Sequence, residues 1–211
     1  SMHTTDDYNQ HFANEPVTLC WLRRDLRMDD NAALYHALRN YDNVLPLFIF
    51  DTEILDKLDD KADRRVDFIH HSLALLKTQL EALGSSLLVL HGNPVTLFEK
   101  LTVKNVYTNH DYEPYAIQRD KQVADVLKSK GGMLHTFKDQ VIFEKSEVVK
   151  DDGKPYTVFT PYSKKWKAKC TDFYYRSYPV DRHTHNLKKT LPLPMPSLAQ
   201  LGFNATNMSY P

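Results

Sequence analysis

The fold is decided by the stretch VTLCWLRRDLRMDDNAAL at residues 17–34. Val17 to Leu22 is a short apolar run with β-branched residues, which predicts a buried strand. A loop rich in arginine and aspartate follows. Asn31 to Arg39 then predicts a helix, because the acidic residues before it suit a helix N-terminus. A strand, a charged loop and a helix in succession indicate the opening unit of an α/β domain.

The same alternation continues to about residue 137. Apolar runs predict four further strands at 44–50, 86–90, 104–108 and 133–137. Amphipathic or capped segments predict helices at 64–83, 94–101 and 114–130. Gly84 and the pair Gly131-Gly132 are typical of helix ends, where glycine adopts the left-handed conformation.

This order of elements predicts parallel strands joined by right-handed crossovers. We expect an α/β fold with a five-stranded doubly wound parallel sheet in the order 3-2-1-4-5, Rossmann-like, followed by a long extended linker. In such a sheet the ligand crevice lies beyond the carboxyl ends of the strands, where the strand order reverses. Here the crevice is expected between strands 1 and 4.

Three segments are predicted along the chain. Residues 1–15 are polar and lack the apolar core of a secretory signal, so they are interpreted as a disordered leader. Residues 16–140 form the α/β domain. Residues 141–211 are interpreted as an interdomain linker, since the strand and helix pattern stops and most of the 11 prolines lie there. The many aromatic residues of this linker predict that it lies against a folded surface.

Composition bounds the class of protein. With 211 residues, 42% hydrophobic and 26% charged, the chain resembles an ordinary soluble domain. Two distant cysteines fit a reducing, cytoplasmic location, and no cluster has the spacing of a metal site. The glycine-rich phosphate loops of dinucleotide-binding and P-loop enzymes are absent from the sequence, which argues against those classes. After residue 150 the chain is basic. A solvated linker is favoured there over a surface for nucleic acid, because the basic residues are scattered.

Two charged loops are the candidates for chemistry. The first runs from Trp21 to Arg27, directly after strand 1. It suits either a rim for an anionic or planar ligand or a structural pairing of arginine with aspartate. The second runs from Asn109 to Pro114, after strand 4, and is expected to face the first. Its carboxylates suit ligand contacts, but Glu113 also suits the N-terminus of the next helix, with Arg119 reaching back to a carboxylate.

Three segments together resemble the photolyase/cryptochrome family. WLRRDLRMDDNAAL at 21–34 is similar to that family's W-x-R-x-D-L-R-x-x-D-N-x-A-L opening. NHDYEPYAIQRD at 109–120 is similar to its Y-E-P…R-D segment, and PYTVFTPYSKKW at 155–166 to its linker signature. The three occur in the family's order, which makes the resemblance specific.

The resemblance implies an N-terminal α/β domain, a linker and a C-terminal helical domain that binds FAD and damaged DNA. The 211 residues are expected to stop before that helical domain, so no catalytic residue is expected among them. The parent protein is expected to be a light-dependent deoxyribodipyrimidine photo-lyase that repairs cyclobutane pyrimidine dimers, while the fragment alone is inactive. The alternative is a cryptochrome-type blue-light photoreceptor. The implied partners are the protein's own helical domain and, through it, damaged DNA, with no membrane.

The resemblance also implies an antenna chromophore on the α/β domain. Folate-binding members have Asn-Glu where this chain has Tyr115-Ala116, so a deazaflavin or flavin antenna is expected rather than folate. The residues that match the family's deazaflavin-type pocket are Arg24, Asp25, Phe48, Asp51, Asp111 and Glu113.

Overall fold

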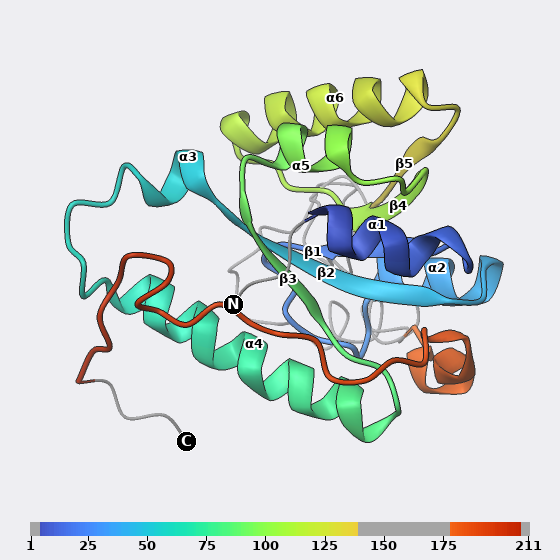
Figure 1. Ribbon diagram of the computed structural model, residues 1–211, viewed down its shortest axis with the longest axis horizontal. Helices are drawn as coiled ribbons and strands as arrows, with labels where there is room; N and C mark the ends of the chain where they lie inside the picture. The colour runs from blue at the N-terminus through green and yellow to red at the C-terminus, as the bar shows by residue number, and fades with distance from the viewer. Residues whose placement is uncertain (1–4, 139–177, 208–211) are drawn as a thin grey trace, which may run out of the picture.

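The computed structural model describes residues 5–138 and 178–207 (Figure 1). The predicted linker signature at 155–166 lies outside these described residues. The five strands are β1 (Thr18–Leu22), β2 (Val44–Asp51), β3 (Leu88–Gly92), β4 (Asn105–Asn109) and β5 (Met133–Phe137). They form one parallel sheet in the order β3-β2-β1-β4-β5, which confirms the predicted fold class and strand order.

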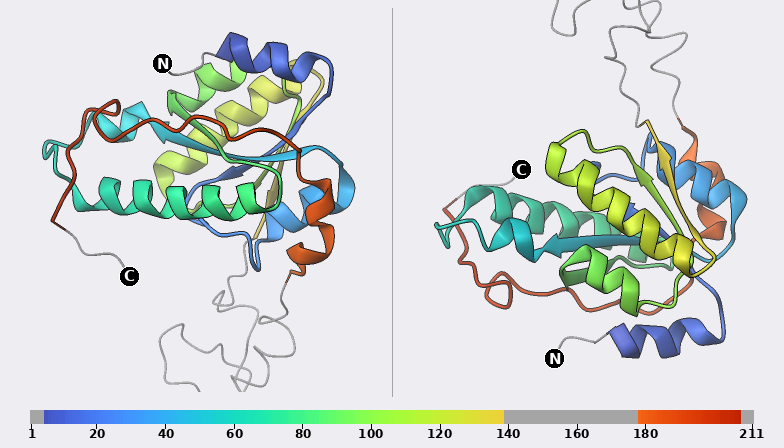
Figure 2. Two further views of the ribbon diagram at one scale, coloured as in Figure 1. Left: turned by 60° about the horizontal axis from the view of Figure 1, so that its bottom comes forward. Right: turned by 90° about the horizontal axis from the view of Figure 1, so that it is seen from above.

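Helices cover both faces of the sheet (Figures 1 and 2). One face carries α1 (Thr5–Ala13), α5 (Pro94–Lys100) and α6 (Pro114–Ser129), while α2 (Ala32–Asn40), α4 (Arg64–Ala82) and the 3₁₀ helix η2 (Val180–Asn186) lie on the other. The short helix α3 (Thr52–Leu55) follows β2 directly. Among the described helices, none combines the length and apolar character needed to cross a membrane.

Each strand of this arrangement contributes to two cores. Along β1, Leu19 and Trp21 point into the core beneath α5 and α6, whereas Cys20 and Leu22 point into the core beneath α2 and α4. This alternation follows from the two-residue period of a strand. Since both faces are covered, all five residues of β1 are buried, as the unbroken apolar run predicts.

The amino-terminal segment corrects one prediction. Thr5–Ala13 form helix α1, and its Tyr8 and Phe12 are only 3% and 6% exposed in the α5/α6 core. The prediction of a disordered leader over residues 1–15 is therefore wrong for these nine residues. Their two apolar side chains are four apart and lie on one helical face, a signal that the polar composition of the segment obscures.

The described part of the predicted linker also contributes to the domain. Val180, Leu187, Leu201 and Phe203 are buried in the α2/α4 core. Backbone hydrogen bonds hold this segment in place, including one of 2.8 Å from the Lys188 amide to the Val44 carbonyl. Residues 178–207 therefore lie along the domain and complete one of its cores (Figure 2).

The start of α4 gives a first prediction. Asp63 caps this helix, since its carboxylate accepts a 2.8 Å hydrogen bond from the Arg65 amide. The hydrogen bond from the Arg65 side chain is the main cause that lowers the pKa of Asp63. We expect Asp63→Ala to reduce the free energy of unfolding by about 1 kcal/mol at neutral pH.

The same substitution should lose its effect in acid. A carboxylate whose pKa is lower in the folded chain stabilises the fold above its unfolded pKa, and this contribution disappears as pH falls through the folded pKa. Urea unfolding at about pH 7 and about pH 3 measures both values. Asp59→Ala, at an exposed position nearby, is the control. An equal loss for Asp63→Ala at the two pH values would contradict the role of the carboxylate.

Candidate functional site

The carboxyl ends of β1 and β4 bring the two charged loops together. The Arg23 guanidinium is only 7% exposed and lies 2.5 Å from the Asp120 carboxylate. It also donates a hydrogen bond to the backbone carbonyl of Asn109. Arg23 therefore joins the loop after β1 to the end of β4 and to α6, which is a structural role.

Arg24 extends the contact between the same loops at the surface. Its Nη2 lies 3.2 Å from Glu113 Oε1, and its Nε lies 3.9 Å from Asp111 Oδ2. The predicted juxtaposition of these arginines and carboxylates is thus present in the structure. Because the Arg24 side chain is 71% exposed, the ion pair adds little stability and is free to reorganise around a ligand.

Asp25 has a different environment from Arg24. It is buried, and its carboxylate accepts hydrogen bonds from the Arg23 amide, the Asn31 side chain and the Asn109 side chain at 3.0, 3.1 and 2.7 Å. Asn109 in turn accepts a hydrogen bond of 2.9 Å from the amide of Ala33, at the start of α2. These contacts pin the first loop against β4 and α2, so Asp25 has a structural role. Asparagine side chains take part in it, which the predicted pairing of arginine with aspartate did not include.

A cavity of about 200 Å³ lies at this edge of the sheet. It extends past β1 to the end of β2. The crevice was expected between strands 1 and 4, which is only part of the cavity. Five of the six residues predicted to bind a chromophore line it, namely Arg24, Phe48, Asp51, Asp111 and Glu113. Asp25 does not line it, and faces a smaller hollow of about 120 Å³ between the two loops.

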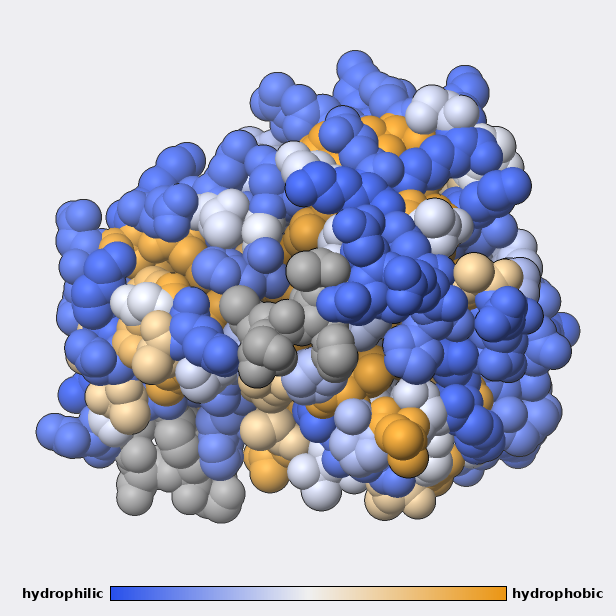
Figure 3. All heavy atoms as spheres, viewed as in Figure 1, coloured by the Kyte–Doolittle hydropathy of each residue, from blue (hydrophilic) through white to orange (hydrophobic). Residues whose placement is uncertain are grey.

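The walls of the larger cavity are mainly apolar. Phe48 and Phe50 meet edge to face with ring centroids 4.9 Å apart, and Ile54, Leu55 and Ile69 lie on the side of α3 and α4. Apolar residues also show at the surface between these helices, whereas the surface over α6 is mainly hydrophilic (Figure 3). A cavity with apolar walls and a charged rim suits a planar, partly polar ring system.

The polar wall of the cavity is built around Asp51. Its carboxylate is buried and accepts hydrogen bonds from the Tyr115 hydroxyl at 2.7 Å and from Arg119 Nη1 at 3.4 Å. Burial, followed by this hydrogen bond to Asp51, raises the pKa of Tyr115 well above its usual value of 10.0. Tyr115 therefore remains a neutral hydrogen-bond donor at physiological pH.

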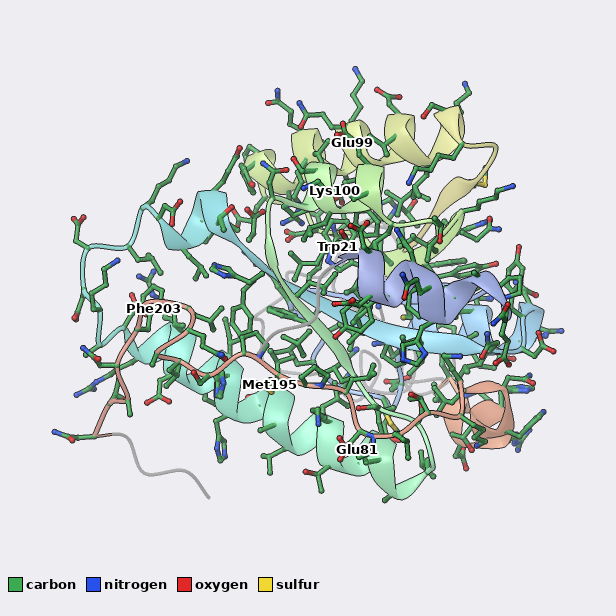
Figure 4. All side chains as sticks on the ribbon, viewed as in Figure 1. Trp21, Glu81, Glu99, Lys100, Met195 and Phe203 are labelled. Carbon is green, nitrogen blue, oxygen red and sulfur yellow. The ribbon has the colours of Figure 1, made fainter. Side chains whose placement is uncertain are left out.

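Trp21 supports the same wall from below, on the side of the sheet that faces α5 (Figure 4). Its ring meets Phe98 of α5 edge-on, with centroids 5.1 Å apart. The guanidinium carbons of Arg23 and Arg119 each lie 4.8 Å from the centre of the Trp21 ring. These cation–π contacts hold both arginines beside the cavity.

Sequence reasoning missed part of this lining. Tyr115, Ala116 and Arg119 all line the cavity from α6. Their spacing of one and four residues places them on one face of the first turns of a helix. The spacing was readable in the sequence, but only the position of α6 over the sheet shows that this face points to the cavity.

Several known proteins are similar to this chain in sequence. The DNA photolyase family matches residues 18–186. A deoxyribodipyrimidine photo-lyase from a Synechococcus strain is 35% identical over 195 residues, which cover 88% of this chain and 40% of that protein. Cryptochrome-2 of Arabidopsis thaliana is 34% identical over 161 residues, which cover 74% of this chain and 25% of that protein.

A solved structure shares the fold as well. The archaeal photolyase from Sulfolobus tokodaii is 32% identical, with a TM-score of 0.58 over 62% of this chain and 31% of that one. That crystal structure contains two FAD molecules and implies a novel light-harvesting cofactor.

The fold is a doubly wound α/β domain with a cavity at the carboxyl ends of its strands, the place where domains of this class bind ligands. The chain belongs to the DNA photolyase family, since the family match covers most of its length. It spans 40% of the length of the Synechococcus photo-lyase.

Proposed function

We propose that these 211 residues are the antenna-binding part of a light-dependent deoxyribodipyrimidine photo-lyase that acts on cyclobutane pyrimidine dimers in DNA. The observation that carries the proposal is the cavity at the ends of β1, β2 and β4, which combines five of the residues expected for a chromophore with apolar walls. The antenna would collect light and pass the excitation to the FAD of the whole protein.

The residues of the cavity fit a flavin or a deazaflavin. A tricyclic ring would lie against Phe48, Phe50 and Ile54, and its polar edge would face Arg24 and Glu113. The volume of about 200 Å³ is below the range of about 300 to 1,000 Å³ usual for pockets that bury a drug-sized molecule. We therefore expect these residues to bury only part of the ring and to bind it weakly when tested alone.

A folate antenna fits less well. Tyr115 and Ala116 occupy the positions where folate-binding relatives are expected to have Asn-Glu, and both line the cavity. Tyr115 already donates its hydroxyl hydrogen to Asp51, and Ala116 offers no carboxylate. The pair therefore cannot make the polar contact expected with folate, which supports a flavin-type ring.

The proposed site predicts which amides a chromophore protects. Titration of FMN into the 211-residue chain is expected to slow hydrogen exchange in the loops at 23–27 and 109–113, because a bound ring covers both. Ile54→Glu should weaken FMN binding about tenfold, since it places a charge in an apolar wall. Ile54 is 45% exposed, so the fold should tolerate the change.

The matched control is Leu75→Glu on α4, which is 52% exposed and lies outside the cavity lining. This variant should bind FMN as the unaltered chain does. Binding of FMN with no protection at either loop, or equal weakening by the two glutamates, would contradict the proposed location.

The catalytic part of the proposal has its own test. The photo-lyase from Synechococcus is matched over only 40% of its length, so we expect the 211 residues alone to repair no cyclobutane dimers when FAD and blue light are supplied. Dimer repair is measured as loss of the lesion from an irradiated oligothymidylate. Repair by the purified 211-residue chain would contradict this assignment.

A cryptochrome-type blue-light photoreceptor is the second candidate. It is favoured by the 34% identity to cryptochrome-2 of Arabidopsis thaliana. Light-dependent repair by the full-length protein would distinguish the enzyme from the photoreceptor.

A further inference from the structure

A second cavity of about 220 Å³ adjoins the proposed chromophore site. Tyr115 and Arg119 line both cavities, so these two side chains form the boundary between them. The other residues of the second cavity come from α3, α5, the cap of α5 and α6, and they are Glu53, Asn93, Val95, Gln118 and Gln122. This cavity is polar, in contrast to its neighbour.

The boundary contains a guanidinium that is not fully satisfied. The Arg119 side chain is only 9% exposed. Its Nη1 donates to Asp51, but Nη2 has no hydrogen-bond partner among the described residues, nor has Nε, which lies 3.5 Å from an oxygen of Asp120. A buried donor without an acceptor is unfavourable, so the site gains if a ligand oxygen or nitrogen accepts from Arg119.

The charges of the second cavity select the kind of group it can hold. The lining holds one cation, Arg119, and one anion, Glu53, and its other polar side chains are the neutral Tyr115 and three amides. Side-chain amides donate hydrogen bonds to hydroxyl groups and accept them, and a carboxylate accepts them. A phosphate at the same place would face Glu53 and be repelled. The lining therefore suits a hydroxylated, uncharged chain.

We propose that the second cavity is a subsite for the polyhydroxylated side chain of the antenna, of the ribityl type, with its ring in the larger cavity. The ring and the chain would meet at Tyr115 and Arg119, where a chain hydroxyl accepts a hydrogen bond from Arg119 Nη2. This inference rests on the proposed function and adds the group that the site recognises besides the ring.

The experiment compares three flavins on the 211-residue chain. Lumiflavin has the ring without the ribityl chain, riboflavin has both, and FMN carries a terminal phosphate. Riboflavin is expected to bind about tenfold more tightly than lumiflavin, which is the gain from one or two added hydrogen bonds. FMN is expected to bind no more tightly than riboflavin. Quenching of flavin fluorescence measures the three dissociation constants.

A variant tests the residues that make the subsite. Gln118 and Gln122 are exposed and four residues apart on α6. The double substitution Gln118→Leu/Gln122→Leu keeps good helix formers. It should lower the affinity for riboflavin toward that for lumiflavin, because the bond from Arg119 remains, and it should leave lumiflavin binding unchanged. Lys121→Ala, on the same helix but outside both linings, should change neither value.

The outcomes separate the two proposals. Equal affinity for lumiflavin and riboflavin would overturn the subsite but leave the chromophore cavity in place. A riboflavin preference that the double substitution does not diminish would also overturn the subsite. Tighter binding of FMN than of riboflavin would overturn its selectivity for an uncharged chain. Failure of all three flavins to bind would overturn the proposed function itself.

Discussion

Replacing Asp25 by alanine is expected to lower the free energy of unfolding by about 3 kcal/mol. The carboxylate accepts from the Arg23 amide and from the side-chain amides of Asn31 and Asn109. Asn31 and Asn109 are 0% and 4% exposed. One N–H of each would lose its acceptor in a buried place, while the amides keep their bonds to the Arg27 carbonyl and to Asn31 Oδ1. Each such loss costs about 1 to 3 kcal/mol, and the neighbouring acceptors compensate only in part.

Thermal and urea unfolding would measure this loss. A change of 3 kcal/mol corresponds to a fall in Tm of about 6 to 12 °C for a domain of this size. Asp29→Ala is the matched control, because Asp29 is an exposed aspartate of the same loop and should shift stability by less than about 0.5 kcal/mol. If Asp25→Ala weakened flavin binding while leaving stability unchanged, Asp25 would be a ligand residue, as the family resemblance implies.

The position of Asp25 could be predicted from the sequence, but its contacts could not. Its position beyond a buried strand correctly places it at the carboxyl edge of the sheet. Whether it faces a ligand or the protein depends on Asn31 and Asn109, which approach it from α2 and β4. The contact with Asn109 joins residues 84 positions apart, and no local pattern in the sequence encodes it.

The sheet was predictable because its central strands β1 and β2 are buried along their whole length. The continuous apolar run at 44–50 can be read directly from the sequence, and the glycines mark the helix ends. Gly84 has a φ of 83°, a left-handed conformation that glycine adopts at little cost. The bounds were less exact, since β3 begins at Leu88 rather than at the predicted residue 86.

Segments outside the alternating pattern were harder to interpret. Helix α1 holds only two buried apolar side chains, and η2 is a 3₁₀ helix of seven residues without a side-chain cap. Both are stabilised by packing on the sheet domain more than by their own propensity. The polar composition that suggested a leader therefore describes only the outer face of α1.

The sequence also predicted only part of the candidate site. The charged rim follows from the ends of β1 and β4, but the second polar cavity depends on how α3, α5 and α6 meet above the sheet. Glu53, Asn93 and Gln122 are far apart in sequence and line one space. Only the packing of three helices brings them together.

Arg119→Met is expected to have the largest effect on stability and binding together. Arg119 and Asp51 form an ion pair in which the side chains are 9% and 4% exposed. Removing one partner of a buried pair costs about 3 to 5 kcal/mol, because the other charge stays buried. Asp51 keeps its hydrogen bonds from Tyr115 and from the Glu53 amide. We therefore expect a loss of stability near the lower end of this range. Riboflavin binding should fall more than tenfold with the loss of the Arg119 donors.

Two further variants distinguish the effect of the positive charge of Arg119 from the effect of its hydrogen-bond donors. Asp51→Asn combined with Arg119→Met should cost less than the sum of the single changes, because the neutral amide no longer leaves a buried charge unpaired. Arg119→Lys keeps a positive charge near Asp51 but lacks the forked donors of guanidinium. It should retain most of the stability and still bind riboflavin poorly, whereas lumiflavin binding should change less. Strict additivity in urea unfolding would contradict the ion pair. Undiminished riboflavin binding by Arg119→Lys would show that Arg119 holds the fold without contacting the flavin.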